Sequence, residues 1–161
     1  MKRLAPVLSF LLLAACGFQL RGTTSLPFET IYVHNATAGI ALDLKRNIVA
    51  GTGTRVLDDA KAAEAQLQFS EESRQKVILS LTSGGRVSEY RLIYRVRFRV
   101  ADDKGSEFLA PSTVTLTRDM TYDDTQVLAK EAEEQLLFRD MQADMVQQIM
   151  RRIATAHKPK A

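Results

Sequence analysis

Residues 83–100 read SGGRVSEYRLIYRVRFRV and predict a β-hairpin turn followed by a long strand. Gly84 and Gly85 tolerate the positive φ that a tight hairpin turn requires. After this turn, every even position carries a large apolar side chain: Tyr90, Leu92, Tyr94, Val96, Phe98 and Val100. Successive side chains of a strand point to opposite faces, so the pattern predicts one fully apolar strand face that packs in a core.

The odd positions of the same strand carry a row of cations. Arg91, Arg95, Arg97 and Arg99 form this arginine row, and Ile93 is its exception. Two interpretations stay open. The row can be a solvated sheet face, with Asp or Glu placed opposite on neighbouring strands. It can also bind an anion, because the guanidinium fork matches phosphate and carboxylate.

Further strands flank this hairpin. Residues 65–82 alternate, with Leu67, Phe69 and Val77 in one phase, and predict one long strand with a bulge near Glu71–Gln75. A turn over residues 102–105 leads to a β-branched strand over residues 108–117, where Pro111 indicates an edge. Residues 29–34 suit a first strand, and residues 54–57 are a candidate for a short one.

Two helices complete the pattern. The spacing predicts a helix over residues 38–50, capped by Asn35 or Thr37 and stopped by Gly51 and Gly53. A last helix over residues 126–153 follows a cap at Asp123, Asp124 or Thr125. Its predicted buried stripe consists of Leu128, Ala132, Leu137, Met141, Met145, Ile149 and Ile153.

The element order is therefore β-α-β-β-β-α. It predicts a two-layer α+β fold, with a four-stranded, mostly antiparallel sheet and two helices packed on one face. We expect one domain over residues 29–156 and a polar tail over residues 157–161.

The chain begins with a targeting segment. Lys2 and Arg3 precede an uncharged apolar run that ends in Ala14 and Ala15, as in a cleaved signal peptide over residues 1–15. Cys16, the only cysteine, follows directly and completes what looks like a bacterial lipobox. We expect lipid on Cys16 and a tether over residues 16–28. The alternative is an ordinary signal peptide with an incidental cysteine.

Charge and cysteine content exclude several classes. Loss of Lys2 and Arg3 with the leader lowers the net charge from +3 to +1, so overall charge does not indicate a nucleic-acid partner. With its single cysteine used for lipid, the fold depends on its core rather than on disulfides.

The sequence nominates no catalytic or metal site. His34 and His157 are the only histidines, and no third ligand is spaced for zinc. No nucleophile elbow or phosphate-binding glycine loop occurs. We therefore expect no enzyme activity and no cofactor.

Three short segments carry a family resemblance. Residues 16–24 (CGFQLRGTT), Ser88-Glu89-Tyr90 and Leu128-Ala129-Lys130 together resemble the lipopolysaccharide-assembly lipoproteins of the LptE family. The resemblance covers essentially the whole mature chain. Cys16 is followed by Gly17 rather than by Asp, and in this the chain resembles lipoproteins that are sorted to the outer membrane of Gram-negative bacteria.

This resemblance implies a function. LptE proteins plug the outer-membrane β-barrel LptD, assist its assembly and bind lipopolysaccharide during insertion into the outer leaflet. The family's second basic position corresponds to Lys130. The first falls near Ser83, which is not basic, so Arg86 is expected to substitute for it. The alternatives are a plain surface lysine at 130 and a structural or peptidoglycan-associated outer-membrane lipoprotein.

Overall fold

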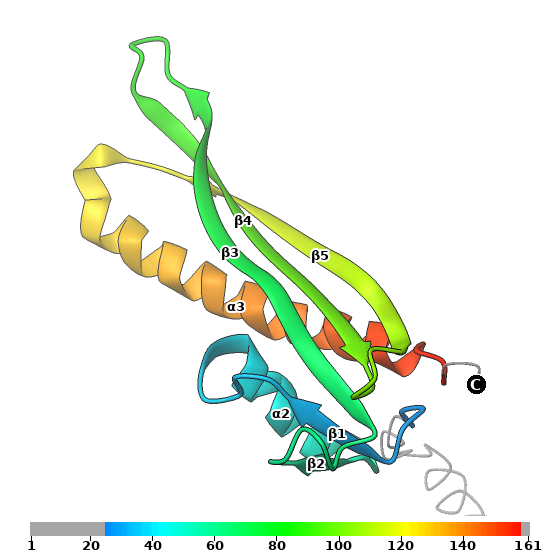
Figure 1. Cartoon of the computed structure of the whole chain (residues 1–161). Coiled ribbons are helices and arrows are strands. Elements are labelled where there is room, and N and C mark those ends of the chain that lie inside the picture. The colour runs from blue at the N-terminus through cyan, green and yellow to red at the C-terminus, as the bar shows by residue number, and fades with distance from the viewer. Residues whose placement is uncertain (1–24, 159–161) are drawn as a thin grey trace, which may run out of the picture.

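The computed structural model describes residues 25–158 as one two-layer α+β domain, shown in Figure 1. The predicted leader, Cys16 and the tether up to residue 24 lie outside the described residues. The elements, in chain order, are β1 (Thr30–Val33), α2 (Gly39–Gly51), β2 (Arg55–Leu57), β3 (Ala65–Leu81), β4 (Val87–Ala101), β5 (Glu107–Thr121), the 3₁₀ turn η1 (Asp124–Gln126) and α3 (Val127–Ala154). The predicted fold class is confirmed.

The sheet is mixed and has the strand order β2-β1-β3-β4-β5. β3, β4 and β5 form the predicted antiparallel meander, and β5, which contains Pro111, lies at the edge. β1 is parallel to both of its neighbours. The sheet has five strands rather than four, because residues 55–57 pair with β1 after the α2 crossover.

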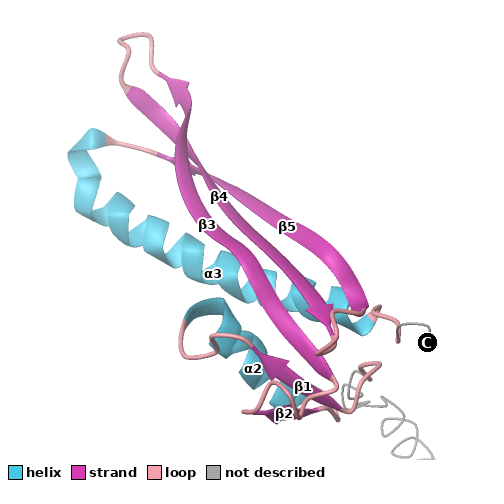
Figure 2. Cartoon of the chain, viewed as in Figure 1, coloured by secondary structure: helices cyan, strands magenta, loops and turns pink. Residues whose placement is uncertain are grey.

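Both helices pack on one face of the sheet, as Figure 2 shows. The even positions of β4 supply the centre of the core: Leu92, Tyr94, Val96 and Val100 are 0% exposed, and Phe98 is 1% exposed. They share one hydrophobic core with Ile40, Leu44 and Ile48 of α2 and with Met145, Ile149 and Ile153 of α3. The alternation in residues 90–100 therefore identified the core face correctly.

The predicted buried stripe of α3 is wrong in its first two turns. Leu128 is 82% exposed and Ala132 is also exposed, whereas the stripe residues from Met141 to Ile153 are fully buried. At about 100° per residue, Leu128 and Ala132 lie about 140° and 180° around the helix from Met141. The inward positions of these turns are instead polar, because Lys130 and Glu134 occupy them.

A bulge changes the phase of β3. The register with β4 shifts between Phe69 and Glu71, just before the predicted segment. After this shift the even positions of β3 lie opposite the buried positions of β4, for example Arg74 opposite Tyr94. Val77, which is in phase with Leu67 in the sequence, is consequently 40% exposed, whereas Leu67 is 0% exposed.

The turns and caps differ in detail from the prediction. In the hairpin turn only Gly85 has a positive φ, 77°, and the Thr82 N–H donates to the Arg86 carbonyl over 2.7 Å. α2 begins after Ala38 without a side-chain cap. Its end is stabilised by Thr52, whose hydroxyl donates to the Ile48 carbonyl over 2.7 Å, and neither Gly51 nor Gly53 has a positive φ.

The two ends of the described chain meet beside the start of β5, at Phe108. Leu26 and Phe28 are buried in the core, so the packed body begins within the segment predicted as tether. Phe28 packs edge-to-face on Phe108 at 5.6 Å, and the His157 N–H donates to the Phe108 carbonyl over 3.0 Å. The first residues of the predicted tail are thus bound to the sheet.

Candidate functional site

The structure brings Arg86 and Lys130 to the same end of the molecule. We call this the distal end; it comprises the β3–β4 hairpin over residues 76–90 and the segment from Tyr122 to Glu134. In Figure 1 the β3–β4 hairpin projects past the start of α3. The Arg86 guanidinium lies 3.3 Å from the Asp124 carboxylate, and the Tyr122 N–H donates to the Ser88 carbonyl over 2.8 Å. These contacts join the hairpin to the start of the helix.

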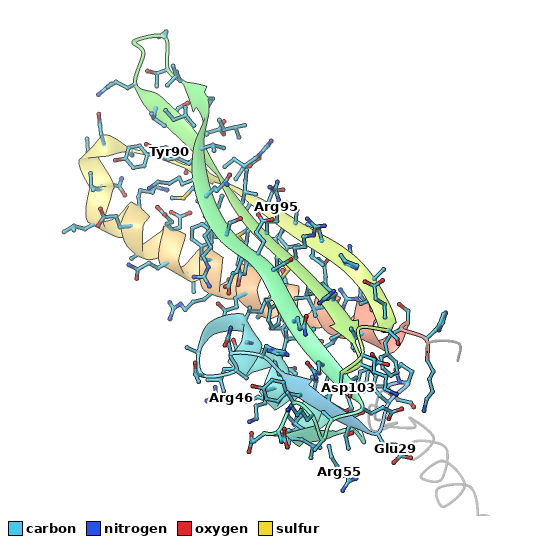
Figure 3. All side chains as sticks on the ribbon, in the orientation of Figure 1. Glu29, Arg46, Arg55, Tyr90, Arg95 and Asp103 are labelled. Carbon is cyan, nitrogen blue, oxygen red and sulfur yellow. The ribbon has the colours of Figure 1, made fainter. Side chains whose placement is uncertain are left out.

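An aromatic pair separates the two basic residues. Tyr90 and Tyr122 pack edge-to-face with 5.0 Å between ring centroids, and Figure 3 marks this region by the Tyr90 label. Tyr122 lines two hollows, one of which includes Arg86 and the other Lys130. The two cations therefore flank one tyrosine rather than touching each other.

Lys130 is held in place by its neighbours. Its side chain is only 16% exposed, and its ammonium donates to Glu133 over 2.8 Å and to the Thr121 hydroxyl over 3.1 Å. The hollow beside it, about 60 Å³, is lined also by Lys76, Tyr90 and Glu134. Lys130 is therefore mostly covered and ion-paired.

Lys76 is a third cation at the distal end that the sequence did not nominate. Its ammonium lies 5.0 Å from the Tyr90 ring centroid and 2.6 Å from the Glu134 carboxylate. The hydrogen bond to Glu134 raises the pKa of Lys76 above its ordinary value. Lys76 reaches this site only because β3 changes phase at its bulge, which sends the even positions towards α3.

Each cation of the distal end has a carboxylate partner. Arg86 pairs with Asp124, Lys130 with Glu133 and Lys76 with Glu134. The pKa of Asp123 lies below its ordinary value, because the Thr125 N–H and hydroxyl donate to it and Arg86 and Lys130 add positive charge. An anionic ligand that binds here has to displace these carboxylates from the cations.

The same end exposes apolar side chains. Ile78 and Leu81 of the hairpin are 58% and 56% exposed, and Val127 and Leu128 at the start of α3 are 40% and 82% exposed. Val127 lines the same hollow as Lys130. Cations beside exposed apolar groups form a surface suited to an amphiphile with anionic head groups.

The arginine row lies on the opposite, open face of the sheet. Arg91 forms two hydrogen bonds with Asp119, of 2.7 and 2.9 Å, and Arg95 lies 4.0 Å from Glu71. Arg99 donates to the Gln68 amide oxygen over 2.9 Å. Within residues 25–158, no carboxylate lies within 4.0 Å of the guanidinium of Arg97 or Arg99. Cross-strand pairing therefore accounts for only half of the row.

Other kinds of site find no support in the described part of the chain. No group of three His, Cys, Asp or Glu side chains within residues 25–158 could hold a metal ion. His34 instead bonds the Gln66 amide over 3.0 Å. None of the helices in this range is both long and apolar enough to cross a bilayer.

Comparison with known protein families gives a consistent match. The family model described as "LptE: Lipopolysaccharide-assembly" matches residues 28–153. The LPS-assembly lipoprotein LptE of Photorhabdus laumondii is 26% identical over 153 residues, covering 93% of this chain and 83% of the relative. The protein of the same name from Pectobacterium atrosepticum is also 26% identical, covering 92% of this chain and 82% of its own.

Solved structures agree with this match. An uncharacterized lipoprotein B from Nitrosomonas europaea is 39% identical, with a TM-score of 0.74, covering 88% of this chain and 99% of that chain. The rare lipoprotein B from Shewanella oneidensis is 26% identical, with a TM-score of 0.66, covering 78% of this chain and 92% of its own. Both share the fold described above.

Proposed function

Because the chain belongs to the LptE family of non-enzymatic lipopolysaccharide-assembly lipoproteins, we propose that it plugs the outer-membrane β-barrel LptD and binds lipopolysaccharide during insertion. The observation that carries this proposal is the family match over residues 28–153, which spans the packed body from Phe28 to the last turn of α3.

The membrane anchor is the first part of the proposal. Lipid on Cys16 holds the mature protein at the outer membrane, and residues 16–24 connect it to the packed body. Nine residues of extended chain span at most about 32 Å. The body is therefore confined close to the bilayer surface, where a barrel partner and a lipid ligand are both within reach.

The open sheet face suits a plug. The lumen of an outer-membrane barrel is polar and wet. Arginines on β4 and threonines on β5, such as Thr113 and Thr115, make this face polar, and no described element covers it. An apolar open face would not be compatible with such surroundings.

The distal end is the proposed ligand site. Arg86 and Lys130 hold phosphates of lipopolysaccharide by charge-assisted hydrogen bonds, which are stronger than neutral ones. Lys76 adds a third donor in the hollow of Lys130. The exposed side chains of Ile78, Leu81 and Leu128 lie where they can contact the apolar part of the same ligand.

Replacement of Arg86 and Lys130 by Gln should weaken lipopolysaccharide binding about tenfold or more, because each lost hydrogen bond to a charged group is worth about 1.5–3 kcal/mol. The lipidated protein in detergent micelles is titrated with lipopolysaccharide, and the dissociation constants are compared. Since Lys130 is mostly covered, this variant should also lose about 1 kcal/mol of folding stability.

The matched control is Lys104→Gln with Arg151→Gln, which removes the same charge from exposed positions outside the distal end. It should leave the dissociation constant unchanged. Equal affinities for the Arg86/Lys130 variant and wild type would remove these residues from the site. No measurable binding by the wild-type protein would contradict the proposed ligand altogether.

A further inference from the structure

The arginine row divides into two halves with different surroundings. Arg91 and Arg95 face the carboxylates of Asp119 and Glu71. Arg97 lies directly across from Glu71 in the strand register, yet the nearest guanidinium to that carboxylate is that of Arg95. Arg97 and Arg99 thus carry two charges that no described carboxylate neutralises.

These two residues border a hollow beside the β3 bulge. The register shift at Ser70 interrupts the pairing of β3 with β4 beside Arg97 and Phe98. A hollow of about 330 Å³ opens at this point, lined by Gln68, Ser70, Arg97, Arg99 and Pro111 among others. The unpaired charges therefore border a concave site rather than a flat surface.

A chain of side-chain hydrogen bonds orients Arg99 without neutralising it. The Arg99 Nε donates to Gln68 Oε1 over 2.9 Å, and the Gln68 amide lies 3.4 Å from Gln66 Oε1. The Gln66 amide in turn donates to the Ala60 carbonyl over 2.9 Å and lies 3.0 Å from the His34 Nε2. The amide partner engages only Nε, so the two terminal nitrogens of the guanidinium remain available to a ligand.

We propose that Arg97 and Arg99 form a second anion site, which binds a phosphate monoester of lipopolysaccharide; this rests on the proposed function. Residues two apart on a strand are about 6.7 Å apart and point to the same face, so two guanidinium forks can hold one tetrahedral anion. A phosphate monoester carries about −1.5 to −2 charges at neutral pH, which matches the pair better than one carboxylate.

This site is separate from the distal end. Arg86 directly precedes β4 and Arg99 lies near its end, so the strand separates them by twelve to thirteen residues, or about 40 Å. A ligand phosphate at one site therefore does not reach the other, and binding at each can be measured without the other.

The test uses the lipidated protein in detergent micelles, with Arg86→Gln and Lys130→Gln as background. Adding Arg97→Gln and Arg99→Gln should weaken the remaining lipopolysaccharide binding tenfold or more. The matched control adds Arg91→Gln and Arg95→Gln, which remove the same charge from the same strand face, and should change the affinity less than twofold. With enzymatically dephosphorylated lipopolysaccharide, the two variants should bind equally.

Equal binding of phosphorylated lipopolysaccharide by the two variants would overturn the proposal. So would a loss of barrel copurification in the Arg97/Arg99 variant with lipopolysaccharide binding intact, because the row would then meet an acidic protein surface. If the wild-type protein bound no lipopolysaccharide, the proposed function would fail. Titration with inorganic phosphate would then show whether Arg97 and Arg99 bind an anion. Saturable shifts of the Arg97 and Arg99 Nε–H NMR signals would support it, and unshifted signals would exclude it.

Discussion

Replacement of Cys16 by Ser should move the protein from the membrane fraction to the soluble fraction of cells. Each buried methylene of an acyl chain contributes about 0.8 kcal/mol to membrane binding, and a second chain makes the anchor stable. The serine variant loses every acyl chain in one step, so nearly all of the protein should change fraction. Sedimentation of membranes followed by immunoblotting measures the distribution.

A matched control is Thr23→Ser, which alters the same segment and leaves the thiol in place. This variant should stay with the membranes. Mass spectrometry of the wild-type protein should show residues 1–15 removed and acyl chains on Cys16. A serine variant that remained in the membrane fraction would contradict the lipid anchor.

The second large effect is expected for Phe98→Ala. Phe98 is 1% exposed near the end of β4 and belongs to the core that β4 forms with the helices. Truncating a buried Phe typically costs about 3–5 kcal/mol, through lost burial and the cavity that remains. Chemical denaturation followed by circular dichroism should show this loss as a lower midpoint with an unchanged slope.

Leu128→Ala is the control, because the structure and the sequence pattern differ on whether Leu128 is buried. The pattern places Leu128 in the buried stripe of the last helix, whereas the structure exposes 82% of it. Its truncation should change folding stability by no more than about 0.5 kcal/mol. A loss comparable to that of Phe98→Ala would show that the first turns of α3 pack differently.

The antiparallel core of the fold could be predicted because its signal is local. Alternation from Tyr90 to Val100 continues without interruption, and β4 is regular over these residues. β3 was predicted less well, because the bulge at Ser70 reverses the face of the positions from Glu71 to Ile78. The sequence shows Val77 and Leu79 in phase with Leu67. It predicts a bulge near Glu71–Gln75, but it does not show that this bulge turns Val77 to the other face.

The helix prediction failed for a related reason. The predicted α3 stripe reaches Ala132 from Leu137 by a step of five residues, which turns the helix by about 140° beyond one full turn. Lys130 and Glu134 take the inward positions because β3 presents Lys76 to them. A charged strand position facing a helix becomes evident only when the two elements are seen together.

The candidate site was predicted in part. Lys130 and Arg86 came from the family resemblance, and their common location at the distal end is a structural finding. The division of the arginine row was not predictable, because Asp119 lies 28 residues from Arg91 in sequence. Only the strand register identifies which arginines find a carboxylate and which do not.

The most direct test of the account is affinity purification of the tagged chain from outer membranes in mild detergent, with its partners identified by mass spectrometry. The account predicts that one large outer-membrane β-barrel copurifies with the tagged protein in equal amount and that lipopolysaccharide is retained. Recovery of the lipoprotein alone, while other membrane complexes in the same extract stay intact, would contradict it.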